Sequence, residues 1–142
     1  MNFSASRRIR FADCDPAGIV FFPQYFVMLN GFVEQWFDEA LALPYAGLIA
    51  ERRLGLPTVR LEADFCAISR HGDDLCLSLT VEKLGRSSLT LLHRFAADAD
   101  DQLRLQVRQV LVCTSLQTHR PQALPDDLRG AIAAFTTAEE PR

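Results

Sequence analysis

The sequence lacks the long apolar runs of a membrane protein and the cysteine pattern of a disulfide or zinc scaffold. Nowhere do about 18 apolar residues follow one another, so we expect no membrane-spanning helix. Residues 1–15 place charged side chains ahead of any apolar run and offer no small-residue cleavage site, so we expect no secretory signal. The cysteines lie far apart without metal-type spacing, which predicts free thiols in a reducing cytoplasm and no bound metal. They are Cys14, Cys66, Cys76 and Cys113.

Positive charge is also scarce for a nucleic-acid-binding protein. Lys and Arg total 15 against 18 Asp and Glu, which gives a net charge of −3. Because nucleic-acid binding depends on neutralising phosphates, this balance argues against a nucleic-acid partner. Lys83 is the only lysine. An arginine bias of this kind is typical both of phosphate binding and of a GC-rich genome.

Several catalytic signatures are missing as well. The chain has no glycine-rich nucleotide loop of the G-x-G-x-x-G or G-x-x-x-x-G-K-[ST] type and no G-x-S-x-G nucleophile elbow. Its three histidines, His71, His93 and His119, share neither helical nor metal-ligand spacing. We therefore expect no cofactor, and we expect His93, on the inner face of a strand, to be structural.

What the sequence does contain is one apolar helix followed by strands. The chain has 142 residues, 49% of them hydrophobic, which suits a single domain over residues 1–142. Residues 7–12 alternate as a half-buried strand would, with Ile9 and Phe11 on one side. From Pro23 apolar residues recur at spacings of three and four, which predicts a helix of about eighteen residues. This helix is apolar over much of its circumference, so we expect other elements to wrap around it.

After Pro57 the chain alternates between apolar and polar residues with a period of two, as antiparallel strands do. Val59, Leu61 and Phe65 share one face of the first of these strands, and Gln109 is the one polar member of the apolar face of the last. Four such strands and the early one predict an α+β fold, in which a five-stranded antiparallel sheet curls around one long apolar helix. Because sheet edges and apolar outer faces need cover, this architecture favours a dimer.

The segment DCDPAGIVFFPQYF, residues 13–26, places two carboxylates in a loop shaped by proline and glycine. Such carboxylates often only open a loop or cap a helix. Asp15, however, lies too far before Pro23 to cap the helix, and the intervening IVFF is apolar. Poor hydration makes a carboxylate a better base or nucleophile, so Asp15 is a candidate catalytic residue beside the purely structural alternative.

This segment resembles the active-site stretch of the hotdog-fold acyl-CoA thioesterases of the 4-hydroxybenzoyl-CoA thioesterase type. It carries that family's D-C-D-P-A-G-I-V, two aromatic positions, a proline, one further residue and a tyrosine. A looser likeness extends over residues 7–120, including ERRLGLPTVRLEADF, where the family also has a proline leading into a strand. The resemblance implies the hotdog fold, whose sheet wraps the long helix, and an acyl-CoA thioesterase that needs no metal or cofactor.

The resemblance also implies roles for two residues. Asp15 matches the family's second Asp, which attacks the thioester carbonyl or activates water for the attack, and the sequence does not separate these routes. Phe22 matches the aromatic position whose backbone N–H, at the start of the long helix, polarises the carbonyl oxygen. Developing negative charge is stabilised at a helix N-terminus, which makes this role physically reasonable.

Candidate acyl-binding residues follow from the same match. Asn30 stands where the 4-hydroxybenzoyl enzyme has an Asp that accepts the ring hydroxyl, and it also suits a plain helix position. Aromatic side chains near the start of the helix, including Phe21 and Tyr25, favour an aryl or other bulky apolar acyl group. Such a group of aromatic residues is equally typical of a core.

The family meets the phosphates of CoA with basic surface residues. Its basic turn is represented here by Gly85-Arg86-Ser87-Ser88, so Arg86 is the first candidate for a phosphate contact. Arg70 and Arg120 are weaker candidates. The alternative for each is a solvated arginine, because ion contacts on a surface are frequent and weak.

Three functions compete at this point, and none fixes the acyl group or the pathway. The first is a cytoplasmic acyl-CoA thioesterase, with aryl-CoA substrates foremost, assembled as a homodimer or as a homotetramer made of two dimers. The second is an acyl-ACP thioesterase, which the net acidity of the chain disfavours. The third is a non-catalytic hotdog module that binds acyl-CoA, which would have no need of a carboxylate beside the thioester.

Overall fold

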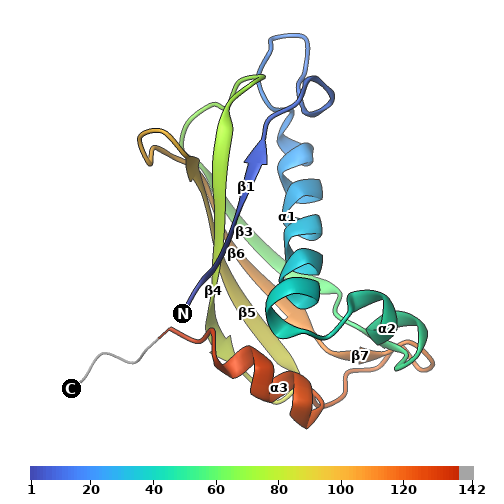
Figure 1. The fold of residues 1–142 in the computed structure, drawn as a ribbon. Helices are drawn as coiled ribbons and strands as arrows, with labels where there is room; N and C mark the ends of the chain where they lie inside the picture. The colour runs from blue at the N-terminus through green and yellow to red at the C-terminus, as the bar shows by residue number, and fades with distance from the viewer. Residues whose placement is uncertain (138–142) are drawn as a thin grey trace.

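A long helix that crosses one face of an antiparallel sheet dominates the fold (Figure 1). In this computed structural model, which describes residues 1–137, helix α1 (Phe22–Trp36) continues into a π-helical segment, η2 (Phe37–Leu41). Pro23 occupies the first turn, where its missing N–H costs no hydrogen bond. The left-handed backbone of Ala42 ends the helix. The helix predicted from its apolar spacing is confirmed.

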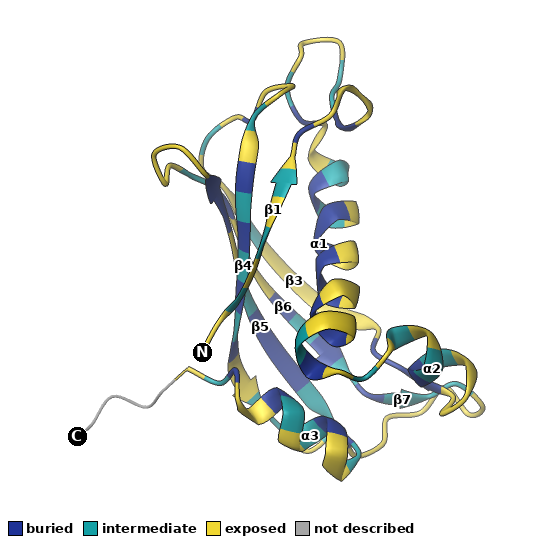
Figure 2. Ribbon diagram, in the orientation of Figure 1, coloured by how far each residue is buried: buried dark blue, intermediate teal, exposed yellow. Residues whose placement is uncertain are grey.

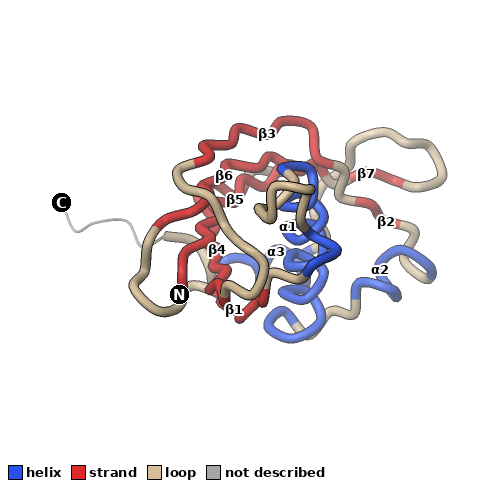
Figure 3. Tube along the Cα trace, turned by 90° about the horizontal axis from the view of Figure 1, so that it is seen from above, coloured by secondary structure: helices blue, strands red, loops and turns tan. Residues whose placement is uncertain are grey.

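The sheet has five antiparallel strands in the order β1-β4-β5-β6-β3. They are β1 (Phe3–Arg8), β4 (Asp74–Leu84), β5 (Ser88–Ala97), β6 (Leu103–Val112) and β3 (Thr58–Phe65). Seen from above, the strands form an arc beside α1 (Figure 3). The predicted α+β architecture, a five-stranded antiparallel sheet curled around one long helix, is confirmed.

Smaller elements complete the fold around this pair. The C-terminal end of α1 is flanked by helices α2 and α3, as Figure 1 shows. A short 3-10 turn, η1, precedes α1, and the short strands β2 and β7 pair as a two-stranded ribbon. Their bounds are η1 (Phe11–Asp13), α2 (Tyr45–Ala50), β2 (Leu54–Gly55), β7 (Thr114–Ser115) and α3 (Asp126–Ala133). None of the helices in residues 1–137 has the length and apolar character needed to cross a membrane.

One buried polar group interrupts the apolar core between α1 and the sheet. The Nε2 atom of His93 lies 2.8 Å from the Oε1 atom of Gln109, whose Nε2 donates to the Thr58 hydroxyl at 2.9 Å. Burial lowers the pKa of His93 to about 4, so its ring is neutral near pH 7. The ring also packs edge-on against Phe32, so His93 has the structural setting that was expected.

The predicted strand over residues 7–12 was wrong in its position. Strand β1 covers Phe3–Arg8 and ends before the chain turns into η1. Ile9 is buried as expected, whereas Phe11 is exposed. The cause is local, because the Asp13 side chain accepts a hydrogen bond from the Arg10 backbone and closes a turn that no strand could continue through.

The predicted inner face of β3 is not buried either. Val59, Leu61 and Phe65 are exposed, and Figure 2 shows β3 as a mostly exposed strand. Val27 of α1 is exposed as well. Strand β3 is an edge strand. Helix α1 reaches it at Phe65, whose ring lies 6.1 Å from that of Tyr25. The sheet therefore does not wrap the helix on all sides, and an apolar surface remains along β3.

Candidate active site

The N-terminal end of α1 is held in place by a loop that is bonded to the segment before β4. Within residues 9–21, the Val20 N–H donates to the Ser69 carbonyl at 2.9 Å, and the Ile9 carbonyl accepts from the Gly72 N–H at 2.8 Å. Ile19 and Arg70 also form an antiparallel bridge. These backbone bonds fix the loop that carries both carboxylates.

The first carboxylate, Asp13, holds the loop together. Its two oxygens accept hydrogen bonds from the Arg7 guanidinium, both at 3.2 Å, and Oδ2 also accepts the Arg10 N–H at 2.8 Å. Only 6% of Asp13 is exposed. A buried carboxylate that accepts this many hydrogen bonds stabilises the loop and has no free oxygen for a reaction.

The second carboxylate, Asp15, has far fewer partners. Its Oδ1 accepts the Ala17 N–H at 2.9 Å, and its Oδ2 has no hydrogen-bond partner within residues 1–137. The turn closes through a bond from the Gly18 N–H to the Asp15 carbonyl, with Gly18 at a positive φ of 78° that suits glycine. The Asp15 side chain is half-exposed. The poorly hydrated surroundings expected for this carboxylate are therefore not present in the described part of a single copy of the chain.

A free backbone donor lies at the start of the helix. Phe22 is the first residue of α1, and Phe21, which precedes it, has an extended backbone. The carbonyl of Phe21 accepts from the Gln24 N–H at 2.8 Å, but the N–H of Phe22 has no acceptor within the described part of the chain. Such a donor at the positive end of the helix dipole attracts an oxyanion.

Next to this donor lies an apolar cavity of about 310 Å³. It is lined by Ile19, Val20, Phe22, Tyr25, Phe65, Cys66, Ala67, Ile68 and Ser69. These residues come from the loop, the first turn of α1, and the end of β3 with the segment that follows it. The size and the largely apolar lining are those of a small-molecule site.

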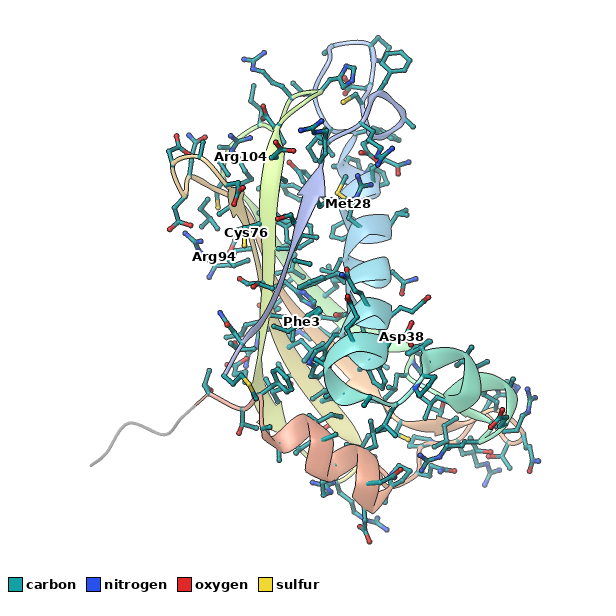
Figure 4. The ribbon with its side chains drawn as sticks, in the orientation of Figure 1. Phe3, Met28, Asp38, Cys76, Arg94 and Arg104 are labelled. Carbon is teal, nitrogen blue, oxygen red and sulfur yellow. The ribbon has the colours of Figure 1, made fainter. Side chains whose placement is uncertain are left out.

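Two hydroxyl groups belong to the lining of this cavity, and an ion pair lies behind one of them. The Tyr25 hydroxyl lies 2.9 Å from Oγ of Ser69, which also accepts from Nη1 of Arg104 at 3.2 Å. The same Nη1 donates to Asp73 at 2.8 Å. Burial alone would raise the pKa of Asp73, but hydrogen bonds from Arg104 and the Arg70 N–H hold it below the usual value. Figure 4 shows Arg104 toward the end of the sheet that lies nearest the loop.

Some predicted site residues meet at this end of the molecule. Phe22 and Tyr25 both line the cavity, and Phe21 is exposed beside them with its ring 5.7 Å from that of Phe22. Arg70 belongs to the segment that holds the loop. Asn30 lies farther along α1, where it is exposed and does not line the cavity.

Two predicted phosphate-binding residues lie elsewhere. Arg86 is in the turn after β4, and β4 begins at Asp74, near the loop, and runs the length of the sheet to Leu84. An eleven-residue strand spans about 33 Å, so Arg86 lies far from Asp15 in the same chain. Arg120 is next to β7 at that same distant end, where its carbonyl accepts the Ser115 N–H. The positions of these turns relative to the loop could not be predicted from residue spacing.

Ser69 and Arg104 were not predicted. Ser69 lies just after β3, where the alternation of apolar and polar residues ends, and a lone serine there carries no signal of its own. Arg104 occupies a polar position of β6, like the other arginines of the sheet. Its burial and its hydrogen bonds to Ser69 and the Ile68 carbonyl set it apart, and these depend on how β6 packs against the segment before β4.

Residues 9–132 match the protein family described as the Thioesterase-like superfamily. The chain belongs to this family. It is 33% identical over 139 residues to a 1,4-dihydroxy-2-naphthoyl-CoA hydrolase of Synechococcus sp. (strain WH7803), covering 91% of this chain and 87% of the relative. It is 28% identical over 127 residues to the 4-hydroxybenzoyl-CoA thioesterase of Pseudomonas sp. (strain CBS-3), covering 87% and 90%.

Solved structures of thioesterases share the fold. The 1,4-dihydroxy-2-naphthoyl-CoA thioesterase Slr0204 of Synechocystis superposes with a TM-score of 0.86 at 26% identity, covering 94% of this chain and 96% of its own. An aspartate-to-asparagine mutant of 4-hydroxybenzoyl-CoA thioesterase, in complex with 4-hydroxybenzoyl-CoA, superposes with a TM-score of 0.82 at 25% identity, covering 92% and 98%. The expected hotdog thioesterase is thus confirmed as a fold, and the thioester hydrolase as an enzyme class.

Proposed function

We propose that this thioesterase hydrolyses aromatic acyl-CoA esters, of the 4-hydroxybenzoyl-CoA kind, to the free acid and CoA. The observation that carries the proposal is that two polar groups without hydrogen-bond partners lie at the same end of the fold. The carboxylate of Asp15 has an oxygen without a partner, and the N–H of Phe22 has no acceptor within residues 1–137. An ester carbonyl needs both a nucleophile or base and an oxyanion donor.

The two groups have complementary tasks. The N–H of Phe22 donates a hydrogen bond to the carbonyl oxygen and stabilises the negative charge that develops on it. Asp15 attacks the carbonyl carbon, and the C–S bond breaks as CoA leaves as a thiolate that then takes a proton. Water opens the resulting anhydride and restores the carboxylate. In the other route Asp15 takes a proton from a water molecule that attacks directly.

The cavity favours an aromatic acyl group. Phe22, Tyr25 and Phe65 line it, and the rings of Phe22 and Phe65 meet edge-on at 6.2 Å. Flat aromatic ligands pack well among such rings. The relatives named above act, by their names, on 4-hydroxybenzoyl-CoA or 1,4-dihydroxy-2-naphthoyl-CoA, so we propose these two esters as the first substrates to try.

A second copy of the chain fits the remaining observations. The β3 edge is unpaired within the described residues and carries the exposed side chains of Val59, Leu61 and Phe65. Such an edge favours pairing with another strand. Because Arg86 lies far from Asp15 in one chain, a phosphate contact from Arg86 requires another copy. A homodimer, or a homotetramer made of two dimers, stays our prediction, which sedimentation analysis tests.

The test of the proposed function is steady-state hydrolysis by the wild-type protein. The panel comprises 4-hydroxybenzoyl-, 1,4-dihydroxy-2-naphthoyl-, benzoyl-, phenylacetyl-, short-chain and long-chain acyl-CoA, with one acyl group also presented on a carrier protein. We expect multiple turnover and the highest kcat/KM with an aryl-CoA. A higher kcat/KM for the carrier-protein ester would make the protein an acyl-ACP thioesterase. Binding of acyl-CoA without turnover would make it a binding module.

A further inference from the structure

The hydroxyl groups of Tyr25 and Ser69 form a buried pair in the wall of the cavity. Tyr25 is 4% exposed and Ser69 is 1% exposed, and both line the cavity beside Phe22. Their oxygens lie 2.9 Å apart, within hydrogen-bond distance. A buried polar pair in an otherwise apolar cavity is well placed to fix the orientation of a ligand.

Counting donors and acceptors shows that this pair has one hydrogen to spare. The two hydroxyls carry two hydrogens, and the bond between them uses one. Arg104 contributes another donor, because its Nη1 lies 3.2 Å from Oγ of Ser69. No further acceptor for either hydroxyl occurs within residues 1–137. One hydroxyl hydrogen is therefore left without an acceptor, and buried donors rarely stay so.

Arg104 makes the spare hydrogen a stronger donor. Its guanidinium is largely buried, and the same Nη1 donates to the Ile68 carbonyl at 3.0 Å and to Asp73 at 2.8 Å. A charged donor bound to Oγ of Ser69 polarises the hydroxyl pair. Burial raises the pKa of Tyr25, so its hydroxyl keeps its proton near neutral pH. The cavity wall thus offers a hydrogen and no anionic acceptor.

We infer that the Tyr25–Ser69 pair determines substrate specificity by donating a hydrogen bond to an oxygen atom of the acyl group. This inference rests on the proposed function, because it places the acyl group in the cavity with its carbonyl at the Phe22 N–H. Phe22 and Tyr25 are three residues apart and so lie about one helical turn, about 5 Å, from each other along α1. The recognised oxygen therefore lies on the far side of the ring from the thioester.

The first experiment varies the substrate and needs no mutation. The values of kcat/KM are measured with 4-hydroxybenzoyl-CoA, benzoyl-CoA and 4-methylbenzoyl-CoA, the last of which matches the hydroxylated ring in size but has no oxygen there. We expect a preference of about tenfold or more for 4-hydroxybenzoyl-CoA over both, the effect of about one hydrogen bond. Equal values for the three esters would overturn the inference while leaving the aryl-CoA thioesterase intact. No turnover of any of them would instead count against the proposed function.

The second experiment varies the enzyme. Tyr25→Phe keeps the Ser69 hydroxyl and its contact with Arg104, whereas the double variant Tyr25→Phe/Ser69→Ala has no hydroxyl left. We expect the preference for 4-hydroxybenzoyl-CoA to survive in Tyr25→Phe and to fall to about one in the double variant. A loss already in Tyr25→Phe would assign the donated hydrogen to Tyr25 and support the inference too. A preference that persists in the double variant would overturn it, and because the preference is a ratio, a partly unfolded sample does not change it.

Discussion

The two ends of α1 carry aromatic side chains in opposite states. At its N-terminal end Phe22 is 58% exposed, and its ring helps to line the cavity. At its C-terminal end Trp36 is fully buried, and its ring packs edge-on against Phe37 at 5.5 Å and Phe135 at 5.6 Å. Exposed apolar surface costs stability unless something binds to it. The C-terminal end thus packs into the core, and the exposed N-terminal end fits our proposal that the substrate binds there.

A contrast of the same kind separates two residues that are chemically identical. Asp13 and Asp15 lie in one loop, yet Asp13 is buried with Arg7 as its ion-pair partner and Asp15 is half-exposed with one oxygen free. Groups that the fold has already satisfied are unavailable for chemistry. We therefore assign the reaction to Asp15, whose carboxylate has one oxygen without a hydrogen-bond partner within residues 1–137.

Apart from the loss of Asp15 itself, the largest effect should come from removing the free N–H of Phe22 at the N-terminal end of α1. Phe22→Pro deletes this donor without breaking a helical hydrogen bond, because Phe22 is the first residue of α1 and the extended Phe21 suits a following proline. We expect kcat to fall by about 100-fold to 1,000-fold, as for other oxyanion donors. Phe22→Leu keeps the N–H and serves as the matched control. A similar loss of kcat in both variants would show that the side chain of Phe22, and not its N–H, matters for the reaction.

Truncation of a core side chain near the C-terminal end of α1 should affect stability instead of activity. Leu128 of α3 is fully buried, and Leu128→Ala should lower the free energy of unfolding by about 3 kcal/mol. Urea denaturation measures the loss. Because α3 lies far from the Asp15 loop (Figure 1), the kcat/KM of the folded fraction should stay at the wild-type value. A large fall in kcat/KM would show that the two ends are not independent.

Lowering the pH should decrease the free energy of unfolding through His93. Its pKa is lowered to about 4 in the folded protein from 6.5, so below pH 6.5 the unfolded chain binds a proton that the folded one does not. Stability therefore falls as the pH falls, by about 2 kcal/mol between pH 6.5 and about pH 5 from this residue alone. Comparing wild type with His93→Leu by urea denaturation isolates the contribution. Equal pH slopes for the two proteins would show that the pKa of His93 is the same in the folded and the unfolded chain.

The smallest effect is expected at Arg86. If it contacts a CoA phosphate across two copies of the chain, Arg86→Ala should raise KM for acyl-CoA by about threefold to tenfold with kcat unchanged, since an exposed ion contact is weak. Arg94→Ala is the control, because Arg94 is already paired with Asp101. Kinetics with acyl-CoA and with the acyl ester of pantetheine, which lacks those phosphates, separate the two cases. An equal rise in KM with both esters would assign Arg86 another role.

The elements of the fold could be predicted from spacing, because periodicity reports directly on which residues share a face. The helix from Pro23 and the four strands after Pro57 followed in that way. The exposure of β3 could not be predicted, because apolar and polar residues alternate in an edge strand as they do in a central one. The sequence also does not show which strand lies at the edge of the sheet.

The candidate site could be predicted only where its residues are close in sequence. Asp15 and Phe22 belong to one continuous motif, and both lie at the N-terminal end of α1. Ser69 and Arg104 come from distant segments that meet only in the folded chain, and the distance of Arg86 from Asp15 likewise depends on the fold. A motif thus predicts the groups that we propose to react, whereas packing determines which residues surround the proposed acyl site.

The most direct test compares Asp15→Asn with Asp13→Asn in one set of measurements, kcat/KM with 4-hydroxybenzoyl-CoA and thermal unfolding. We predict that Asp15→Asn loses about two or more orders of magnitude in kcat/KM, the contribution of a catalytic base or nucleophile, while its Tm stays near that of wild type. Asp13→Asn, which weakens the bond to Arg7, should lower Tm and keep the kcat/KM of its folded fraction. Full activity in a folded Asp15→Asn variant would contradict the account.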